Sequence, residues 1–166
     1  MKYQWVLFDA DETLFHFDIL SGLTNMFACY GVRFTQSNFD EYQSVNKPLW
    51  VQYQNNEISA QQLQITRFKL WGEKLNVSPQ ELNEQFLDSM AEICKPLEGA
   101  LELVTSLHKC GIKMGIITNG FAQLQEIRLV RTGFKPYFSP VVISELVGVA
   151  KPHPDIFNYA LKKMDN

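Results

Sequence analysis

Two aspartates lie one residue apart near the start of the chain, directly after a short apolar run. Residues 5–8 form the run, and Asp9 and Asp11 follow it. Its shortness and its aromatic and β-branched residues predict a buried strand that ends at Phe8 or Asp9. Parallel α/β sheets bind their ligands at the carboxyl ends of strands. Two carboxylates there could supply a nucleophile and a general acid, although Asp-Ala-Asp is also a common polar turn.

Two later segments offer groups that suit a phosphate. Thr118, Asn119 and Gly120 follow the apolar residues 115–117 and come just before a predicted helix, whose N-terminus can bind an anion. Lys151 precedes a proline and a last predicted helix. Taken singly, Thr-Asn is an ordinary helix cap and a lysine is an ordinary surface residue.

The elements that must position these groups alternate between helix and strand in the second half of the chain. Such alternation predicts βαβ units, a parallel sheet and right-handed crossovers. In that arrangement the ends of successive strands meet at one edge of the sheet. The expected elements are a helix over 99–109, a strand over 113–117, a helix over 121–133, a strand over 141–143 and a helix from Pro154.

Between the first strand and this alternating part lies a segment with no convincing strand. Asp18 and Thr35 are expected N-caps, and Pro48 is expected to begin a separate short helix. Ser59 and Ser78 each begin a capping-box pattern, and the first of these is expected to start one helix that continues to residue 71. We therefore expect an all-helical insert over 17–95, acting as a lid, and an α/β core formed by 1–16 and 96–166.

Composition narrows the class of protein. The chain has 166 residues, 46% hydrophobic and 20% charged, with a net charge of -3, as an ordinary globular protein does. The sequence lacks the broad positive charge that a nucleic acid polymer would need in a partner, so we expect no such partner. No apolar segment reaches the roughly 20 residues of a membrane helix. A cytoplasmic location is the expectation. The three cysteines, Cys29, Cys94 and Cys110, are too scattered for a disulfide framework or a thiolate zinc site.

In this chain order, the three segments resemble the motifs of the haloacid dehalogenase (HAD) superfamily of phosphotransfer enzymes. Residues 9–13, Asp-Ala-Asp-Glu-Thr, match its first motif, Thr118 its second and Lys151 its third. The resemblance implies a Rossmann-like parallel sheet, and the helical insert is similar to the C1-type cap of that superfamily. Residues 9–14, 45–50 and 116–121 are further similar to the YjjG-type 5'-nucleotidases, which dephosphorylate nucleoside monophosphates.

The resemblance implies a hydrolase, a phosphatase that works through an aspartyl-phosphate. Asp9 would attack phosphorus, and Asp11 would protonate the leaving oxygen and later deprotonate the attacking water. Thr118 and the N–H of Asn119 would hold the phosphoryl oxygens, while Lys151 would balance their negative charge. The expected substrate is a small phosphorylated metabolite, a nucleoside monophosphate.

A carboxylate that attacks a phosphate dianion needs a cation between them, and hard oxygen ligands suit Mg²⁺. The resemblance implies the carboxylate of Asp9 and the backbone carbonyl of Asp11 as ligands. Asp11 argues against the dehalogenase branch, which needs no acid for an alkoxide. A phosphomutase, or a phosphatase acting on another small metabolite, stays open.

Substrate choice is expected to come from the insert. The candidates could stack on a base or form hydrogen bonds to it, although ordinary helix packing or a surface position explains each of them more simply. They are Phe17, Asn46, Lys47, Trp50 and Tyr53.

The chain departs from the superfamily in one respect. The fourth motif, an acidic Gly-Asp-x-x-x-x-Asp loop, has no match in residues 1–166. Without the strand that carries it, the first strand becomes an unpaired apolar edge, which favours self-association of a monomer into a dimer or a swapped form. We expect the chain to be a fragment of a longer phosphatase, with activity of its own in question. A natural remnant that does not catalyse, or an interaction module on this fold, is the alternative.

Overall fold

A computed structural model describes residues 3–164 of the chain. The chain divides into two compact units, one of residues 1–17 with 94–166 and the other of residues 18–93. The first is named the α/β unit and the second the helical unit. The boundaries expected from the sequence, 16/17 and 95/96, differ from this division by one and two residues.

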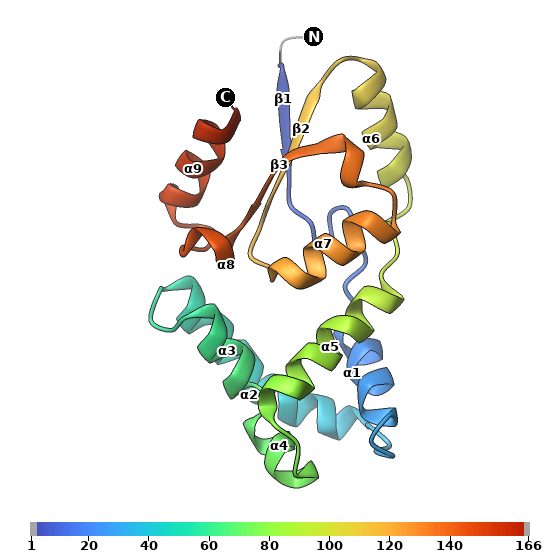
Figure 1. Cartoon of the computed structure of the whole chain (residues 1–166), viewed down its shortest axis with the longest axis vertical. Coiled ribbons are helices and arrows are strands. Elements are labelled where there is room, and N and C mark those ends of the chain that lie inside the picture. The colour runs from blue at the N-terminus through green and yellow to red at the C-terminus, as the bar shows by residue number, and fades with distance from the viewer. Residues whose placement is uncertain (1–2, 165–166) are drawn as a thin grey trace. The chain divides into compact units, whose positions relative to one another are not determined.

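The α/β unit contains a parallel sheet of three strands in the order β1-β2-β3 (Figure 1). In the register, Phe8 pairs with Ile116, and Thr118 pairs with Ile143. The predicted parallel sheet is therefore confirmed. Among the described residues, β1 lies at an edge of the sheet, and its four side chains are half-buried and not fully buried. The strands are β1 (Trp5–Phe8), β2 (Lys113–Thr118) and β3 (Phe138–Ile143).

Helices lie on both faces of this sheet (Figure 1). The predicted helices before β2, after β2 and from Pro154 are confirmed within a few residues. A 3-10 turn before β3 and a short helix after it were not predicted, because three or four residues are too few to show a helical period. These elements are α6 (Ala100–Lys109), α7 (Ala122–Arg131), η1 (Lys135–Tyr137), α8 (Ser144–Val147) and α9 (Pro154–Met164).

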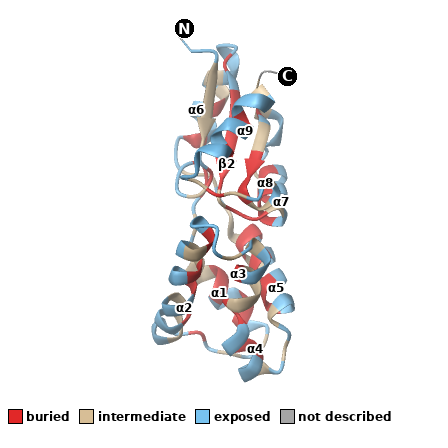
Figure 2. Ribbon diagram, turned by 90° about the vertical axis from the view of Figure 1, so that its left-hand side faces the viewer, coloured by how far each residue is buried: buried red, intermediate tan, exposed pale blue. Residues whose placement is uncertain are grey.

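The alternation of side chains along β2 separates two cores. Met114 and Ile116 pack on one side, in a cluster that includes Phe15 and Phe134. Ile117 packs on the other side with residues of α9. Residues of β2 from Met114 onward are buried, and Figure 2 shows this strand in the buried colour. Since β2 is covered on both faces, it anchors the polar residues that follow it.

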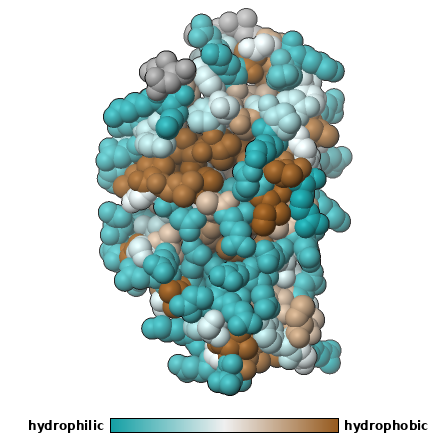
Figure 3. Space-filling model, viewed as in Figure 1, coloured by the Kyte–Doolittle hydropathy of each residue, from teal (hydrophilic) through white to brown (hydrophobic). Residues whose placement is uncertain are grey.

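Not all apolar side chains of the α/β unit are buried. Leu146 on α8 is 70% exposed and Phe157 on α9 is 41% exposed. Figure 3 shows hydrophobic atoms gathered on this part of the surface.

The helical unit has five helices among its residues and no strand, as predicted. Asp18 caps the first helix by accepting a hydrogen bond from Ser21 N at 3.0 Å. Thr35 and Ser59 each form a full capping box with the third residue of the helix that follows. These helices are α1 (Ile19–Ala28), α2 (Gln36–Gln54), α3 (Ala60–Thr66), α4 (Lys69–Leu75) and α5 (Pro79–Ile93).

The prediction that Pro48 begins a separate helix was wrong. The helix α2 continues through Pro48 for nineteen residues in all. Proline removes one backbone hydrogen bond from a helix interior, which favours an end or a kink. In α2 a continuous buried face compensates, because Tyr42, Asn46, Leu49 and Tyr53 all face the interior at helical spacing.

The single helix expected after Ser59 is in fact two, α3 and α4. Phe68 leaves helical geometry with φ -110° and ψ 3°. Arg67, at the end of α3, is buried, donates through Nε to Asn83 Oδ1 at 3.1 Å and lies over the Phe86 ring at 4.9 Å. Arg67 therefore links the C-terminal end of α3 to α5 at the point where the chain leaves the helix.

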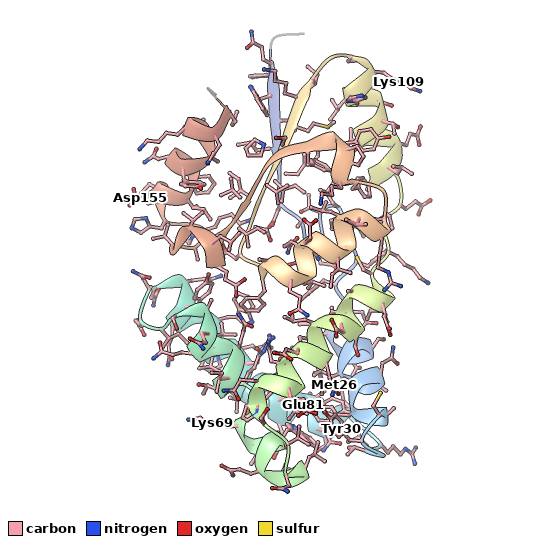
Figure 4. The ribbon with its side chains drawn as sticks, viewed as in Figure 1. Met26, Tyr30, Lys69, Glu81, Lys109 and Asp155 are labelled. Atoms are coloured by element: carbon pink, nitrogen blue, oxygen red, sulfur yellow. The ribbon has the colours of Figure 1, made fainter. Side chains whose placement is uncertain are left out.

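Aromatic rings form the centre of the helical unit. Phe27 stacks on Phe34 with centroids 4.7 Å apart, and Trp71 lies 4.4 Å from Phe27. Figure 4 shows Met26, Tyr30 and Glu81 together where α1 meets α5. These contacts lie entirely within residues 18–93, so the helical unit has a core of its own.

Candidate active site

The loop after β1 turns back on itself and holds Asp9 at the sheet edge. Ala10 N donates to Asp9 Oδ1 at 2.7 Å, and the Asp9 side chain is 47% exposed. Glu12 has a left-handed backbone with φ 53°, and Phe17 N donates to its Oε1 at 2.6 Å. A non-glycine residue rarely adopts this conformation, and here the side chain of the same residue accepts the hydrogen bond from Phe17 N.

Lys151 reaches Asp9 from the loop between α8 and α9. Its Nζ lies 2.7 Å from Asp9 Oδ1, and its side chain is only 21% exposed. The structure thus brings together two residues that are 142 positions apart in the chain and that the sequence assigned to one site. The Lys151 ammonium therefore lies beside the carboxylate that the family resemblance assigns as nucleophile.

Asn119 joins the end of β2 to the Lys151 loop. Its Nδ2 donates to the backbone oxygen of Lys151 at 2.9 Å, and Lys151 N donates to Asn119 Oδ1 at 2.7 Å. The amide therefore bonds both backbone groups of one residue on another loop.

Thr118 is 1% exposed, at the carboxyl end of β2. Its Oγ1 accepts a hydrogen bond from Gly120 N at 3.2 Å. A hydroxyl that accepts in this way can still donate its own proton, for example to a phosphoryl oxygen. The buried strand fixes the position of this hydroxyl.

Asp11 contacts a residue that the sequence did not indicate. Arg128 on α7 is 1% exposed, and its NH1 group forms an ion pair with Asp11 Oδ1. Gln125 Oε1 accepts from Arg128 Nε at 2.9 Å and from NH2 at 2.6 Å, and the Phe15 ring lies 4.7 Å from the guanidinium. Burial raises the pKa of Asp11 above its ordinary value, although the Arg128 charge opposes the shift.

The helical spacing of Leu124, Ile127 and Val130 predicts only part of the buried face of α7. Leu124 is buried, but Val130 is 56% exposed, and the polar Gln125 and Arg128 are buried. A polar pair three residues apart on a helix is a weak sequence signal, since most such pairs are solvated.

Glu145 is a further residue that the sequence missed. It lies on α8, which was not predicted, and its Oε2 accepts from Ala122 N, the first residue of α7, at 2.8 Å. A carboxylate at a helix N-terminus is stabilised by the free N–H groups and the helix dipole. The sequence predicted that the N-terminus of α7 could bind an anion such as phosphate. The N–H of Ala122 at this N-terminus is instead bonded to Glu145.

Residues 3–166 match the sequence profile of the haloacid dehalogenase-like hydrolases. The chain belongs to this family. The match covers both units and includes Asp9, Asp11, Thr118 and Lys151. The suspected family resemblance is confirmed, and the chain is a member of a family of hydrolases.

Two named relatives are pyrimidine 5'-nucleotidases. This chain is 56% identical over 166 residues to YjjG of Escherichia coli, and the alignment covers all of this chain and 73% of YjjG. It is 35% identical over 158 residues to PynA of Streptococcus pneumoniae, covering 92% of this chain and 66% of PynA. The chain thus spans about two thirds to three quarters of the length of these relatives.

Solved structures show the same fold. The hydrolase YfnB of Bacillus subtilis, crystallised with magnesium, superposes with a TM-score of 0.84 at 24% identity, covering 98% of this chain and 74% of YfnB. L-2-haloacid dehalogenase of Xanthobacter autotrophicus superposes at 0.67 and 18% identity, covering 96% of this chain and 64% of that one. These structures support the HAD fold of the chain.

The residues suggested for substrate choice have different environments. In the helical unit, Asn46 and Tyr53 are buried, and Asn46 Nδ2 donates to Gln43 Oε1 at 3.2 Å. Trp50 meets Tyr53 edge to face at 5.8 Å, and Lys47 is exposed. Phe17 is half-buried and belongs to the α/β unit. Packing accounts for Asn46 and Tyr53, whereas Lys47 keeps an exposed side chain.

The carboxylate oxygens of the site are ligands that suit Mg²⁺, but only a few of them are present. Within residues 3–164, no group of three or more His, Cys, Asp or Glu side chains could hold a metal ion. Asp9 offers a half-exposed carboxylate, whereas the carboxylate of Asp11 is bonded to Arg128. Mg²⁺ commonly binds through one or two carboxylates together with substrate phosphate and water, and this HAD site fits that pattern.

No helix in the described part of the chain combines the length and apolarity needed to span a bilayer. Cys29, Cys94 and Cys110 are free thiols.

Proposed function

We propose that this chain carries the site of a Mg²⁺-dependent phosphomonoester hydrolase that forms an aspartyl-phosphate on Asp9. The observation that carries the proposal is the ion pair at the sheet edge, in which Lys151 Nζ lies 2.7 Å from Asp9 Oδ1. A half-exposed carboxylate held beside a fixed cation suits attack on an anionic phosphate, because the lysine offsets negative charge.

In the first step, Asp9 attacks phosphorus, and the bond from phosphorus to the alkoxide oxygen breaks. Oδ1 of Asp9 already accepts from Ala10 N and pairs with Lys151, so attack through Oδ2 leaves both contacts in place. Asp11 gives its proton to the leaving oxygen, and burial raises its pKa toward the protonated form. Thr118 donates its hydroxyl proton to a phosphoryl oxygen.

In the second step, water attacks the phosphorus of the aspartyl-phosphate. Asp11 takes the proton of that water, and the Asp9 carboxylate leaves and is restored. Lys151 balances the negative charge of the phosphoryl oxygens in both steps. Mg²⁺, held by the Asp9 carboxylate and the Asp11 carbonyl oxygen, would supply charge neutralisation between nucleophile and phosphate.

The proposed substrates are pyrimidine nucleoside monophosphates, including deoxynucleotides. The support is the 56% identity, over the whole chain, to a pyrimidine 5'-nucleotidase. Lys47, Trp50 and Phe17 are the residues we propose for contact with the base or sugar, because their side chains are not fully buried.

The test is phosphate release from pyrimidine and purine monophosphates by the full chain, with Mg²⁺ and with EDTA. We expect Mg²⁺-dependent release that favours pyrimidines, at a low rate because residues 1–166 contain no match to the fourth motif. Asp9→Asn should lower turnover by about 10³-fold or more while leaving the circular dichroism spectrum unchanged. Asp155→Asn, at an exposed carboxylate on α9, is the matched control and should keep wild-type turnover. Equal turnover by Asp9→Asn and wild type would refute the mechanism.

A further inference from the structure

The side chain of Asn119 is engaged by protein and not presented to solvent as a substrate ligand. Its donor and its acceptor both bond the backbone of Lys151, at 2.9 Å and 2.7 Å. Both bonds cross 32 positions of sequence, and Asn119 is half-buried beside the fully buried Thr118 and Gly120. We propose that Asn119 is a positioning residue, which holds the Lys151 loop so that Lys151 Nζ reaches Asp9.

Amide geometry explains why asparagine suits this task. A side-chain amide has a donor and an acceptor in one plane, so it can bond the N–H and the C=O of a single residue. Aspartate could accept from Lys151 N but would place a second oxygen against the carbonyl oxygen of Lys151. Leucine has nearly the same shape and would make neither bond.

The backbone of Lys151 needs this support because its side chain is long and flexible. Lysine loses much rotamer freedom when its ammonium is held in one place. The Asp9 contact at 2.7 Å therefore depends on where the Lys151 Cα lies, and that is set by a loop between the short helix α8 and α9. The anchor at Asn119 comes directly after β2, the strand covered on both faces.

The effect on catalysis follows from the charge on Lys151. This inference rests on the proposed function, in which Lys151 neutralises the phosphoryl group. A shift of about 1 Å in a catalytic group can lower a rate by about 100-fold. Removal of the Asn119 amide should therefore lower turnover only through Lys151. In a protein that already lacks the lysine charge, removal of the amide should lower turnover no further.

The first measurement does not depend on turnover. The full chain is treated with acetic anhydride, and the acetylation rate of each lysine is followed by peptide mass spectrometry. Lys151, paired and 21% exposed, should react more slowly than the exposed Lys109, which Figure 4 labels on α6. In Asn119→Leu the rate at Lys151 should rise several-fold, as it should in Asp9→Asn, while the rate at Lys109 stays constant.

Two further variants separate a positioning role from loss of folding. Asn119→Asp keeps one of the two bonds and should give an intermediate rate at Lys151. Asn158→Leu, at an exposed asparagine on α9, is the matched control and should leave the Lys151 rate at its wild-type value. Thermal unfolding by circular dichroism shows which variants are folded. An unchanged Lys151 rate in folded Asn119→Leu or Asn119→Asp would overturn the proposal, whether or not the chain is a phosphatase.

The second measurement is a double-mutant cycle on phosphate release. Asn119→Leu should lower kcat by about 100-fold with a smaller change in KM, because the lysine charge acts mainly in the transition state. Lys151→Met and the double variant should have the same kcat, since the amide acts only through the lysine. Additive losses would show direct contact of Asn119 with the substrate and would refute positioning as its role.

Discussion

Arg128 carries a positive charge at a position that is 1% exposed, and its partners explain why the charge is tolerated there. Gln125 accepts two of its N–H groups, Asp11 accepts a third, and the Phe15 ring lies beneath the guanidinium. A buried charge is costly unless it is paired and hydrogen-bonded. Because Gln125 and Phe15 hold Arg128 in place, Arg128 in turn fixes the orientation of Asp11.

Removal of the Arg128 charge is expected to destabilise the fold. Arg128→Met leaves Asp11 and Gln125 without their partner, and we expect the free energy of unfolding to fall by about 2 to 3 kcal/mol. The expected loss in the free energy of unfolding is smaller than is usual when a buried ion pair is broken, because the Asp11 side chain remains 30% exposed. Urea unfolding measures the change. Arg131→Met, at an exposed position on the same helix, should change the value by less than about 0.5 kcal/mol. Equal values for the two variants would contradict a structural role for the pair.

Sequence patterns predict β2 well, and the structure adds the reason for its glycine. Gly115 lies at the centre of the three-stranded sheet, next to an irregularity in the pairing with β3. A Cβ at this position would lie 2.8 Å from Leu7 Cδ2 and 2.9 Å from the backbone oxygen of Pro140. These are closer than normal contacts, and a backbone oxygen cannot move aside easily. The sheet therefore requires a residue without a side chain at Gly115.

Gly115→Ala tests this close packing. We expect a loss of about 1 to 2 kcal/mol in the free energy of unfolding, because overpacking outweighs the entropy that alanine saves in the unfolded chain. Thermal and urea unfolding measure the loss. Ser106→Ala, at an exposed position on α6, is the control and should be within about 0.5 kcal/mol of wild type. A Gly115→Ala protein as stable as wild type would show that the strands can separate to admit a methyl group.

Each of the two units buries its own apolar side chains. The largest cluster of the α/β unit includes Leu14, Phe15, Val104 and Ile116, all within residues 1–17 and 94–166. The ring contacts around Phe27 and Trp71 lie within residues 18–93. The chain crosses between the units twice, and these crossings are joined by hydrogen bonds from His16 N to Lys95 O at 3.0 Å and from Leu97 N to Leu14 O at 2.9 Å.

Separate cores predict that the helical unit folds by itself. Residues 18–93, expressed alone, should have a helical circular dichroism spectrum and a cooperative thermal transition, because the ring contacts around Phe27 and Phe68 lie within these residues. Phe68→Ala in this fragment should lower the midpoint, since Phe68 is fully buried against Tyr42 and Phe86. A fragment with no cooperative transition would show that its stability depends on the rest of the chain.

Local patterns in the sequence determined most of the elements of this protein and singled out Asp9 and Lys151, which lie together at the sheet edge. The period of the apolar residues indicated the parallel sheet, and the strand ends indicated Asp9 and Thr118, whereas Lys151 was indicated by its position before a proline and the last helix. Both signals depend on spacing over a few residues, which a single sequence displays. The chemistry assigned to these residues came from family resemblance, and the roles remain proposals.

Only the tertiary structure decided which distant groups bond to one another. The contact of Asp11 with Arg128 spans 117 positions and that of Asn119 with Lys151 spans 32. Neither contact produces a periodic pattern in the sequence, because each depends on how a helix is rotated about its axis or on the path of a loop. The same holds for Pro48 within α2, where a buried face on both sides of the proline outweighs its local preference to end a helix.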